Sequence, residues 1–98
     1  EDVPESYHRI LGDRIVNNAK GDGVENILDL MTAKGYEATM EKAAAQKALG
    51  ADVIALSCTG MSSIQIASSI EKAVGIPVLD PVMCEGLLTV FELLRKEI

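Results

Sequence analysis

The fold of this chain is decided by residues 53–80, which read VIALSCTGMSSIQIASSIEKAVGIPVLD. Two short apolar runs, residues 53–57 and 76–80, contain β-branched side chains and are typical of parallel strands buried on both faces. Between them, apolar residues with helical spacing predict a helix that ends at Gly75: Ile66, Ala67, Ile70, Ala73 and Val74. Strand, helix and strand within about 30 residues make a βαβ unit, so the strands should be parallel with a right-handed crossover.

Capping patterns predict where the helices begin. Ser62 and Gln65 have the spacing of a capping box, so we expect the helix of the βαβ unit to begin at Ser62. Asp22 and Glu25 have the same spacing and predict a helix that ends before Gly35, with Val24, Ile27, Leu28 and Met31 on its apolar face. An alanine-rich helix is predicted over residues 38–49, ending at Gly50.

The two ends of the chain are also predicted to be mainly helical. The last helix should follow Asp80 and Pro81, with one apolar face formed by Leu87, Val90, Phe91, Leu94 and Ile98. A short opening helix is predicted up to Gly12, and a short strand over residues 14–17. The predicted fold class is α/β, a small parallel sheet flanked by helices, in a single domain over residues 1–98.

Composition and charge narrow the class of protein. The chain has 98 residues, of which 48% are apolar and 24% charged, as expected of one small globular domain. Its net charge is −6 and its basic residues are scattered, which argues against nucleic acid or a membrane surface as partner. No apolar run approaches the roughly 20 residues of a membrane span, so we expect a cytoplasmic protein with two free thiols, Cys58 and Cys84.

The loop after the first predicted strand is the main candidate site. Open parallel sheets bind ligands beyond the carboxyl ends of their strands, and Cys58 lies at such an end, before a predicted helix. A thiol there should have a lowered pKa and can act as nucleophile or general base. Thr59 supplies a hydroxyl, and the N–H groups of Gly60, Met61 and Ser62 can hold a carboxylate or an oxyanion. The alternative is that Cys58 is a small buried side chain and the loop only a turn.

Other residues have competing interpretations. Asp80 either caps the last helix or orients a ligand from its strand end. Cys84 packs in the core at the start of that helix or acts as a second base. His8 has no Cys or acidic partner at metal-ligand spacing, so it is predicted to be a surface helix residue, and no metal site is predicted. The methionines are predicted to fill the core, Met61 and Met83 being candidates to line a pocket.

Two stretches, residues 50–62 (GADVIALSCTGMS) and 75–82 (GIPVLDPV), resemble the second half of the aspartate/glutamate/hydantoin racemase superfamily. The resemblance is strongest over residues 50–82. It implies an isomerase, a cofactor-independent amino-acid racemase, built from two Rossmann-like halves with the active site in the cleft between them. One cysteine from each half would face opposite sides of the substrate's α-carbon. Cys58 matches the cysteine of the second half, and Thr59 matches the adjacent residue that helps to bind the substrate carboxylate.

The chain departs from this pattern at two points. Glutamate racemases carry a histidine two residues after this cysteine, whereas this chain has Gly60, which is closer to the aspartate or hydantoin branch. The cysteine motif of the first half does not occur in these 98 residues. We therefore expect a carboxyl-terminal half that holds half of an active site. Its partners would be a small amino acid or related carboxylate, and an amino-terminal half or a second copy of the chain in a homo-oligomer.

Three other functions remain open on the sequence. The loop could belong to a non-catalytic module that binds a small carboxylate or phosphate, in which case binding would survive Cys58→Ser. The chain could be an interaction domain that dimerises through its strand-end edge, because a face normally covered by a partner half would be exposed. The same thiol could also serve decarboxylation or cis–trans isomerisation.

Overall fold

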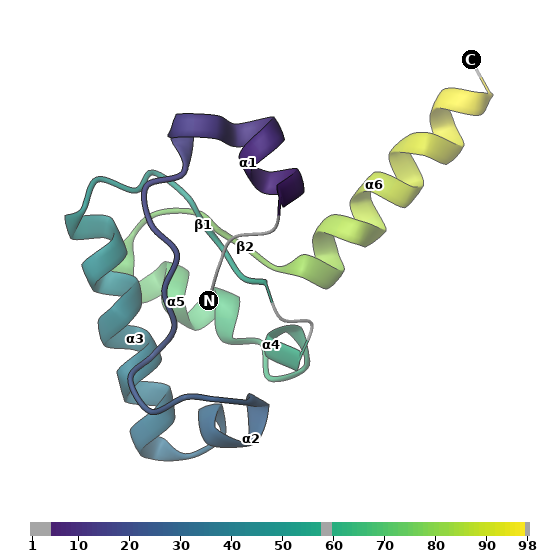
Figure 1. Cartoon of the computed structure of the whole chain (residues 1–98). Helices are drawn as coiled ribbons and strands as arrows, with labels where there is room; N and C mark the ends of the chain where they lie inside the picture. The colour runs from purple at the N-terminus through teal and green to yellow at the C-terminus, as the bar shows by residue number, and fades with distance from the viewer. Residues whose placement is uncertain (1–4, 58–59, 98) are drawn as a thin grey trace. The chain divides into compact units, whose positions relative to one another are not determined.

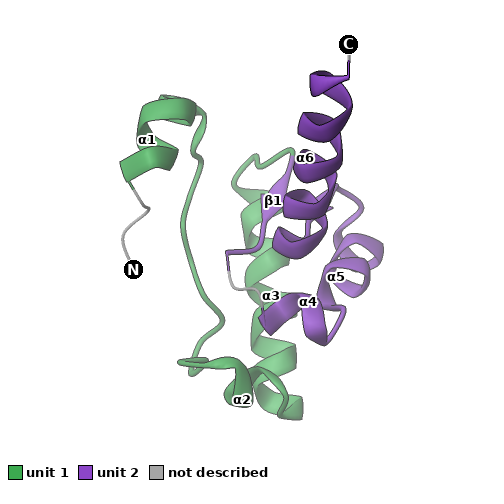
Figure 2. Cartoon of the chain, turned by 90° about the vertical axis from the view of Figure 1, so that its right-hand side faces the viewer, with its two compact units in different colours: residues 1–52 green, residues 53–98 purple. Residues whose placement is uncertain are grey.

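The computed structural model describes residues 5–57 and 60–97 and is mixed α/β, mostly helical with a two-stranded parallel sheet (Figure 1). This confirms the predicted fold class. Its internal contacts separate residues 1–52 from residues 53–98, two compact units that we describe one at a time (Figure 2). The extent of the domain, residues 1–98, stays a prediction.

The first unit begins with the short helix that the sequence predicts, α1 (Glu5–Leu11), followed by a 3-10 turn, η1 (Gly12–Arg14). The Arg14 guanidinium closes the end of α1 by donating to the Ile10 carbonyl at 2.8 Å. The strand predicted over residues 14–17 is wrong. The backbone bonds locally there instead, since the Ile15 N–H donates to the Gly12 carbonyl at 3.3 Å, and residues 15–20 have no regular structure.

The single helix predicted between Asp22 and Gly35 is also wrong. The structure has a one-turn helix, α2 (Ile27–Leu30), and a second helix, α3 (Ala33–Ala48). The physical reason is that two side chains further along the sequence cap these helices: Asn26 accepts from the Asp29 N–H at 3.1 Å, and Thr32 accepts from the Gly35 N–H at 3.0 Å. An N-cap residue takes extended backbone, so each cap fixes where its helix begins.

The alanine-rich helix is confirmed, although α3 begins five residues before the predicted start. It ends as predicted, with Leu49 as C-cap and Gly50 at a φ of 101°. Thr39 and Ala43 lie on its buried face, and Val24 and Leu30 are buried in the same unit. Small side chains on the buried face of α3, such as Ala43, allow neighbouring residues of this unit to pack close to the helix.

The second unit is the predicted βαβ arrangement. Strands β1 (Ile54–Ala55) and β2 (Val78–Leu79) are parallel, with Ile54 opposite Val78 and Ala55 opposite Leu79. The expectation that both faces would be buried is wrong, because Val78 is buried but Ala55 and Leu79 are exposed. Helix α5 (Ile66–Val74) contacts β2, the second strand of this two-stranded sheet.

The connection between the strands holds two helices rather than the one predicted. Helix α4 (Gly60–Ser63) is a single turn, and the chain is interrupted at Gln65, which has a positive φ of 55°. Ser62 therefore lies inside α4 and is not an N-cap, and its carbonyl accepts from the Gln65 N–H at 3.0 Å. The predicted buried face of α5 is confirmed, since Ile66 and Ile70 are each 1% exposed and Val74 is buried.

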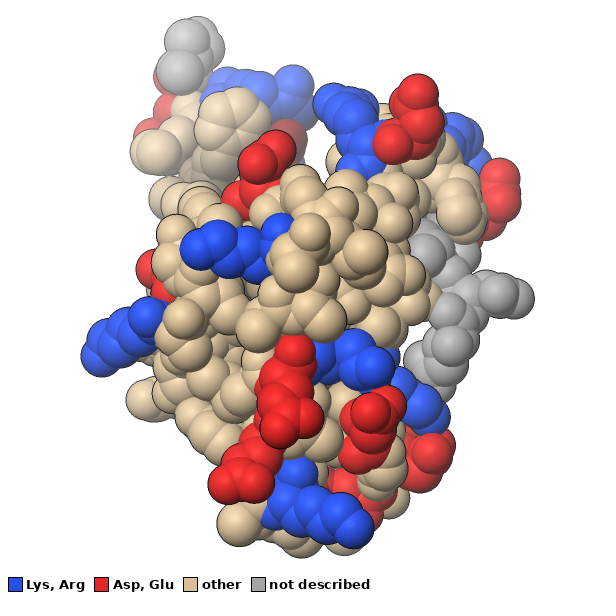
Figure 3. Space-filling model, turned by 90° about the vertical axis from the view of Figure 1, so that its left-hand side faces the viewer, with Lys and Arg blue, Asp and Glu red and all other residues tan. Residues whose placement is uncertain are grey.

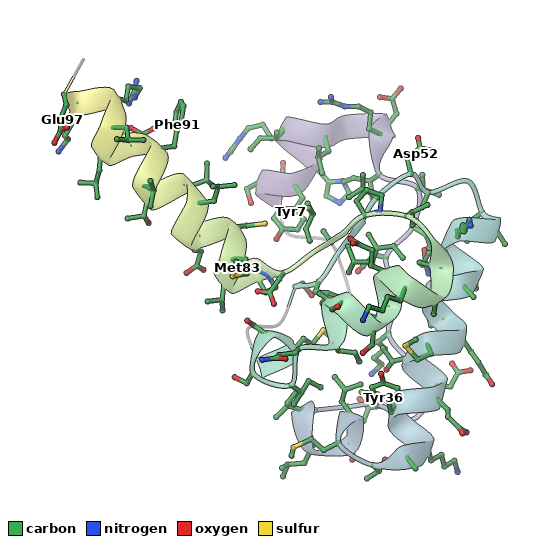
Figure 4. The ribbon with its side chains drawn as sticks, turned by 180° about the vertical axis from the view of Figure 1, so that it is seen from behind. Tyr7, Tyr36, Asp52, Met83, Phe91 and Glu97 are labelled. Atoms are coloured by element: carbon green, nitrogen blue, oxygen red, sulfur yellow. The ribbon has the colours of Figure 1, made fainter. Side chains whose placement is uncertain are left out.

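Helix α6 (Pro81–Lys96) begins where the sequence predicts, but its apolar face is not buried. Leu87 is 73% exposed and Phe91 57%, and Val90 and Leu94 are also exposed, while Ile98 lies outside the described residues. Within its unit, α6 runs away from the sheet (Figure 1), and Phe91 projects from it into the open (Figure 4). The apolar periodicity was sufficient to predict a helix but not what covers it.

Charged side chains of both signs are interspersed over the face shown in Figure 3. Three ion pairs join surface residues: Lys20 with Glu25 at 2.6 Å, Lys42 with Asp22 at 3.3 Å, and Arg95 with Glu92 at 2.6 Å. Such exposed pairs contribute at most about 1 kcal/mol each. In the part of the chain that the structure describes, every helix is too short or too polar to cross a membrane.

Candidate site at the strand ends

The carboxyl ends of β1 and β2 lead into the segments that the sequence predicts to form the site. β1 is followed by α4, which contains Gly60, Met61 and Ser62, all half-buried. β2 is followed by Asp80 and the first turn of α6. Because the strands are parallel, both segments leave the sheet at the same edge, and α4 contacts α6. Cys58 and Thr59 lie outside the described residues, so their roles stay predictions.

Asp80 caps α6, as one of its two interpretations predicts. Its carboxylate Oδ1 accepts from the Val82 N–H at 2.9 Å and from the Met83 N–H at 3.1 Å. Helix α4, which contains Ser62, contacts α6. The amide of Met83 above all, and then the donors of Ser62 and Val82, lower the pKa of Asp80 against the opposing effect of desolvation.

Cys84 lies in the first turn of α6, directly after Met83. Its backbone N–H donates to the Asp80 carbonyl at 3.0 Å, and its side chain is a half-buried free thiol. Met83, at the start of α6 (Figure 4), is 70% exposed and Met31 is 65% exposed, so the prediction that the methionines fill the core is wrong for these two, whereas Met61 is half-buried. The strand-end edge thus carries a thiol on α6 as well as the one predicted after β1.

The contact between α4 and α6 is what sequence reasoning missed. The spacing of Ser62 and Gln65 suggested a local capping pair, whereas Ser62 lies inside α4, a one-turn helix that contacts α6. No local pattern signals such a contact. The topology does, because a βαβ unit brings the residues that follow its two strands to one edge.

Two other features lie away from this edge. A shallow open hollow on the later turns of α6 is lined by Leu88, Thr89, Glu92, Leu93 and Lys96. His8 is exposed on α1, as predicted for a surface helix residue. Over residues 5–57 and 60–97, no three His, Cys, Asp or Glu side chains gather in a way that suits a metal ion.

A family model described as Asp/Glu/Hydantoin racemase matches residues 7–85. The chain belongs to this family. The match confirms the resemblance, covers most of both units and ends in the first two turns of α6, so the exposed apolar residues from Leu87 onward lie beyond it. No curated protein matches the chain.

Proposed function

We propose that this chain is a domain of a cofactor-independent racemase that acts on an amino acid or a related carboxylate, with Cys58 as an acid/base at the α-carbon. The observation that carries the proposal is membership of the racemase family over residues 7–85, a range that includes the strand-end loop with its cysteine. The parallel strands support it, because their carboxyl ends are where such a fold binds ligands.

The chemistry explains why a thiol would be used. An α-proton beside a carboxylate is very weakly acidic, so its removal needs a placed base and donors for the charge that builds on the carboxylate oxygens. The Cys58 thiolate takes the α-proton and becomes a thiol. A second thiol gives a proton to the opposite face of the α-carbon and becomes a thiolate, so protons balance and the centre is inverted.

The loop and α4 supply the donors in this proposal. The first N–H groups of a helix have no carbonyl within that helix to bond, so those of Gly60, Met61 and Ser62 are suited to hold the substrate carboxylate. The hydroxyl of Thr59 adds a further donor. Asp80, also a candidate ligand residue, already accepts from two backbone N–H groups, which favours an indirect role.

The second thiol would come from an amino-terminal half or from a second copy of the chain. Cys84 also lies near the strand-end edge, on the helix that follows the neighbouring strand β2. A second base would have to face the substrate from across a cleft, which this position does not provide. We therefore assign one base to this chain. One base is enough to exchange the α-proton with solvent, even where inversion needs two.

Exchange with solvent tests the proposal and identifies the substrate class. The chain is incubated in D2O with L- and D-amino acids and hydantoins, and loss of the α-proton signal is followed by NMR. The proposal predicts exchange above the protein-free rate for at least one of these compounds. A panel in which every compound exchanges at the protein-free rate would contradict it.

A further inference from the structure

Helix α6 carries a seam of apolar side chains that is exposed in the structure. The seam consists of four large residues spaced three and four positions apart, each more than half exposed: Met83, Leu87, Val90 and Leu94. This is the spacing with which two helices pack side by side in a coiled coil. Contiguous exposed apolar surface of this kind is typical of an interaction site, so the seam needs an occupant.

The junction with β2 keeps the seam off the sheet of the same copy. A single residue, Asp80, connects the end of β2 at Leu79 with the start of α6 at Pro81, whereas a helix that packs on its own sheet usually follows a loop of about 2–6 residues. The Asp80 carboxylate caps α6 by accepting from the N–H groups of Val82 at 2.9 Å and Met83 at 3.1 Å. Helix α6 accordingly leaves the sheet (Figure 1) and could turn back over it only by losing this cap. A second molecule can reach the seam with the cap in place.

The charges of α6 favour a second copy of the chain as the occupant. The helix starts with the acidic residues Asp80 and Glu85, and its last turn contains the basic residues Arg95 and Lys96. Two antiparallel copies of α6 therefore bring the acidic start of each helix to the basic end of the other, and their helix dipoles also attract. A membrane surface fits less well. Helices that lie on membranes carry basic residues along their polar side, whereas that side of α6 begins with Glu85 and Glu92.

We propose that the chain forms an antiparallel dimer through α6, in which the seam of one copy packs against the same seam of a second copy. A twofold axis across the middle of the helix places Leu87 of each copy opposite Val90 of the other, and Met83 opposite Leu94. The same four side chains then serve both copies, as in any interface with this symmetry. The inference is independent of the proposed function, because it requires neither a substrate nor a catalytic residue.

Sedimentation velocity at increasing protein concentration tests the dimer, with Leu87→Glu and Leu88→Glu as a matched pair of variants. Leu87 is 73% exposed and lies in the seam, whereas Leu88 is 63% exposed and lines the hollow on another side of the helix. The unaltered chain should dimerise reversibly. Leu87→Glu should raise the dissociation constant about tenfold or more, because it places an unpaired charge in the seam, and Leu88→Glu should leave it unchanged. An unaltered chain that stays monomeric up to about 1 mM, or equal effects of the two variants, would overturn the proposal.

A mixture of two variants tests the antiparallel direction. Leu87→Glu and Val90→Lys should each dimerise poorly alone. In an antiparallel pair of one copy of each, the new carboxylate faces the new ammonium group, so the mixture should dimerise more tightly than either variant. A mixture that associates no better than its components would overturn the antiparallel pair. Circular dichroism checks that the variants keep their helices, and the unfolding free energy of the dilute, monomeric chain should stay nearly constant, because the seam is exposed in a single copy.

Discussion

Gly35 and Gly86 both lie inside helices, but their surroundings differ. A Cβ built on Gly35 would meet the carbonyl oxygen of Asp29 and lie 2.8 Å from the carbonyl carbon, whereas a Cβ on Gly86 has nothing within 4 Å. Gly35→Ala should therefore destabilise the protein by about 1–3 kcal/mol through overpacking. Gly86→Ala should stabilise it by about 0.5–1 kcal/mol, because alanine loses less backbone entropy. Urea unfolding measures both, and stabilisation by Gly35→Ala would contradict the packing described.

Asp80 should make stability depend on pH in a defined window. Its pKa in the folded chain is lowered from 3.8, so its stabilising effect is fully present above that value and is lost as pH falls through the lower folded pKa. Asp80→Asn keeps a capping oxygen but removes this titration. The Tm difference between the original protein and Asp80→Asn should thus be larger at pH 7 than at pH 3. A difference that does not change with pH would show that the charge of Asp80 contributes nothing.

At the scale of elements, α5 anchors the second unit through side chains four residues apart. Ile66 and Ile70 are each 1% exposed, and the Glu71 carboxylate accepts from the Val78 N–H at 2.9 Å, which joins α5 to β2. Ile70→Ala should cost about 2–5 kcal/mol, the range for removing a buried aliphatic side chain. Ser68→Ala, on the exposed face of the same helix, is the matched control. Similar unfolding free energies for the two variants would contradict the buried position of Ile70.

The strands and the buried face of α5 could be predicted because their patterns are local and regular. Residues 53–57 and 76–80 contain the observed strands, and the spacing of Ile66, Ile70 and Val74 identified the buried face. Capping positions were harder to predict, because several Ser, Thr, Asp and Asn residues compete at each helix start. The structure decides that competition: Asn26 and Thr32 are the N-caps instead of Asp22, and Ser62 lies inside α4 rather than capping it.

At the scale of the whole chain, the exposed apolar residues of α6 lie outside the part of the sequence that matches the family. The match ends at residue 85, and Leu87, Val90, Phe91 and Leu94 follow it on α6, all exposed. An exposed side chain contributes little to folding, so Leu87→Ala should change the unfolding free energy by less than about 0.5 kcal/mol. Urea unfolding checks this, and a loss above about 2 kcal/mol would mean that Leu87 is packed in solution. The sequence could not reveal this exposure, since periodicity does not identify what a helix packs against.

The central claim is that Cys58 removes the α-proton of a substrate, and the most direct measurement is the rate of deuterium incorporation by two cysteine variants. Cys58→Ser and Cys84→Ser are compared in D2O with a compound that the unaltered chain exchanges. The account predicts that Cys58→Ser falls to the protein-free rate, because serine at neutral pH is a far weaker base than a thiolate. Cys84→Ser should keep the rate of the unaltered chain. Exchange that persists in Cys58→Ser, or that disappears in Cys84→Ser alone, would contradict the account.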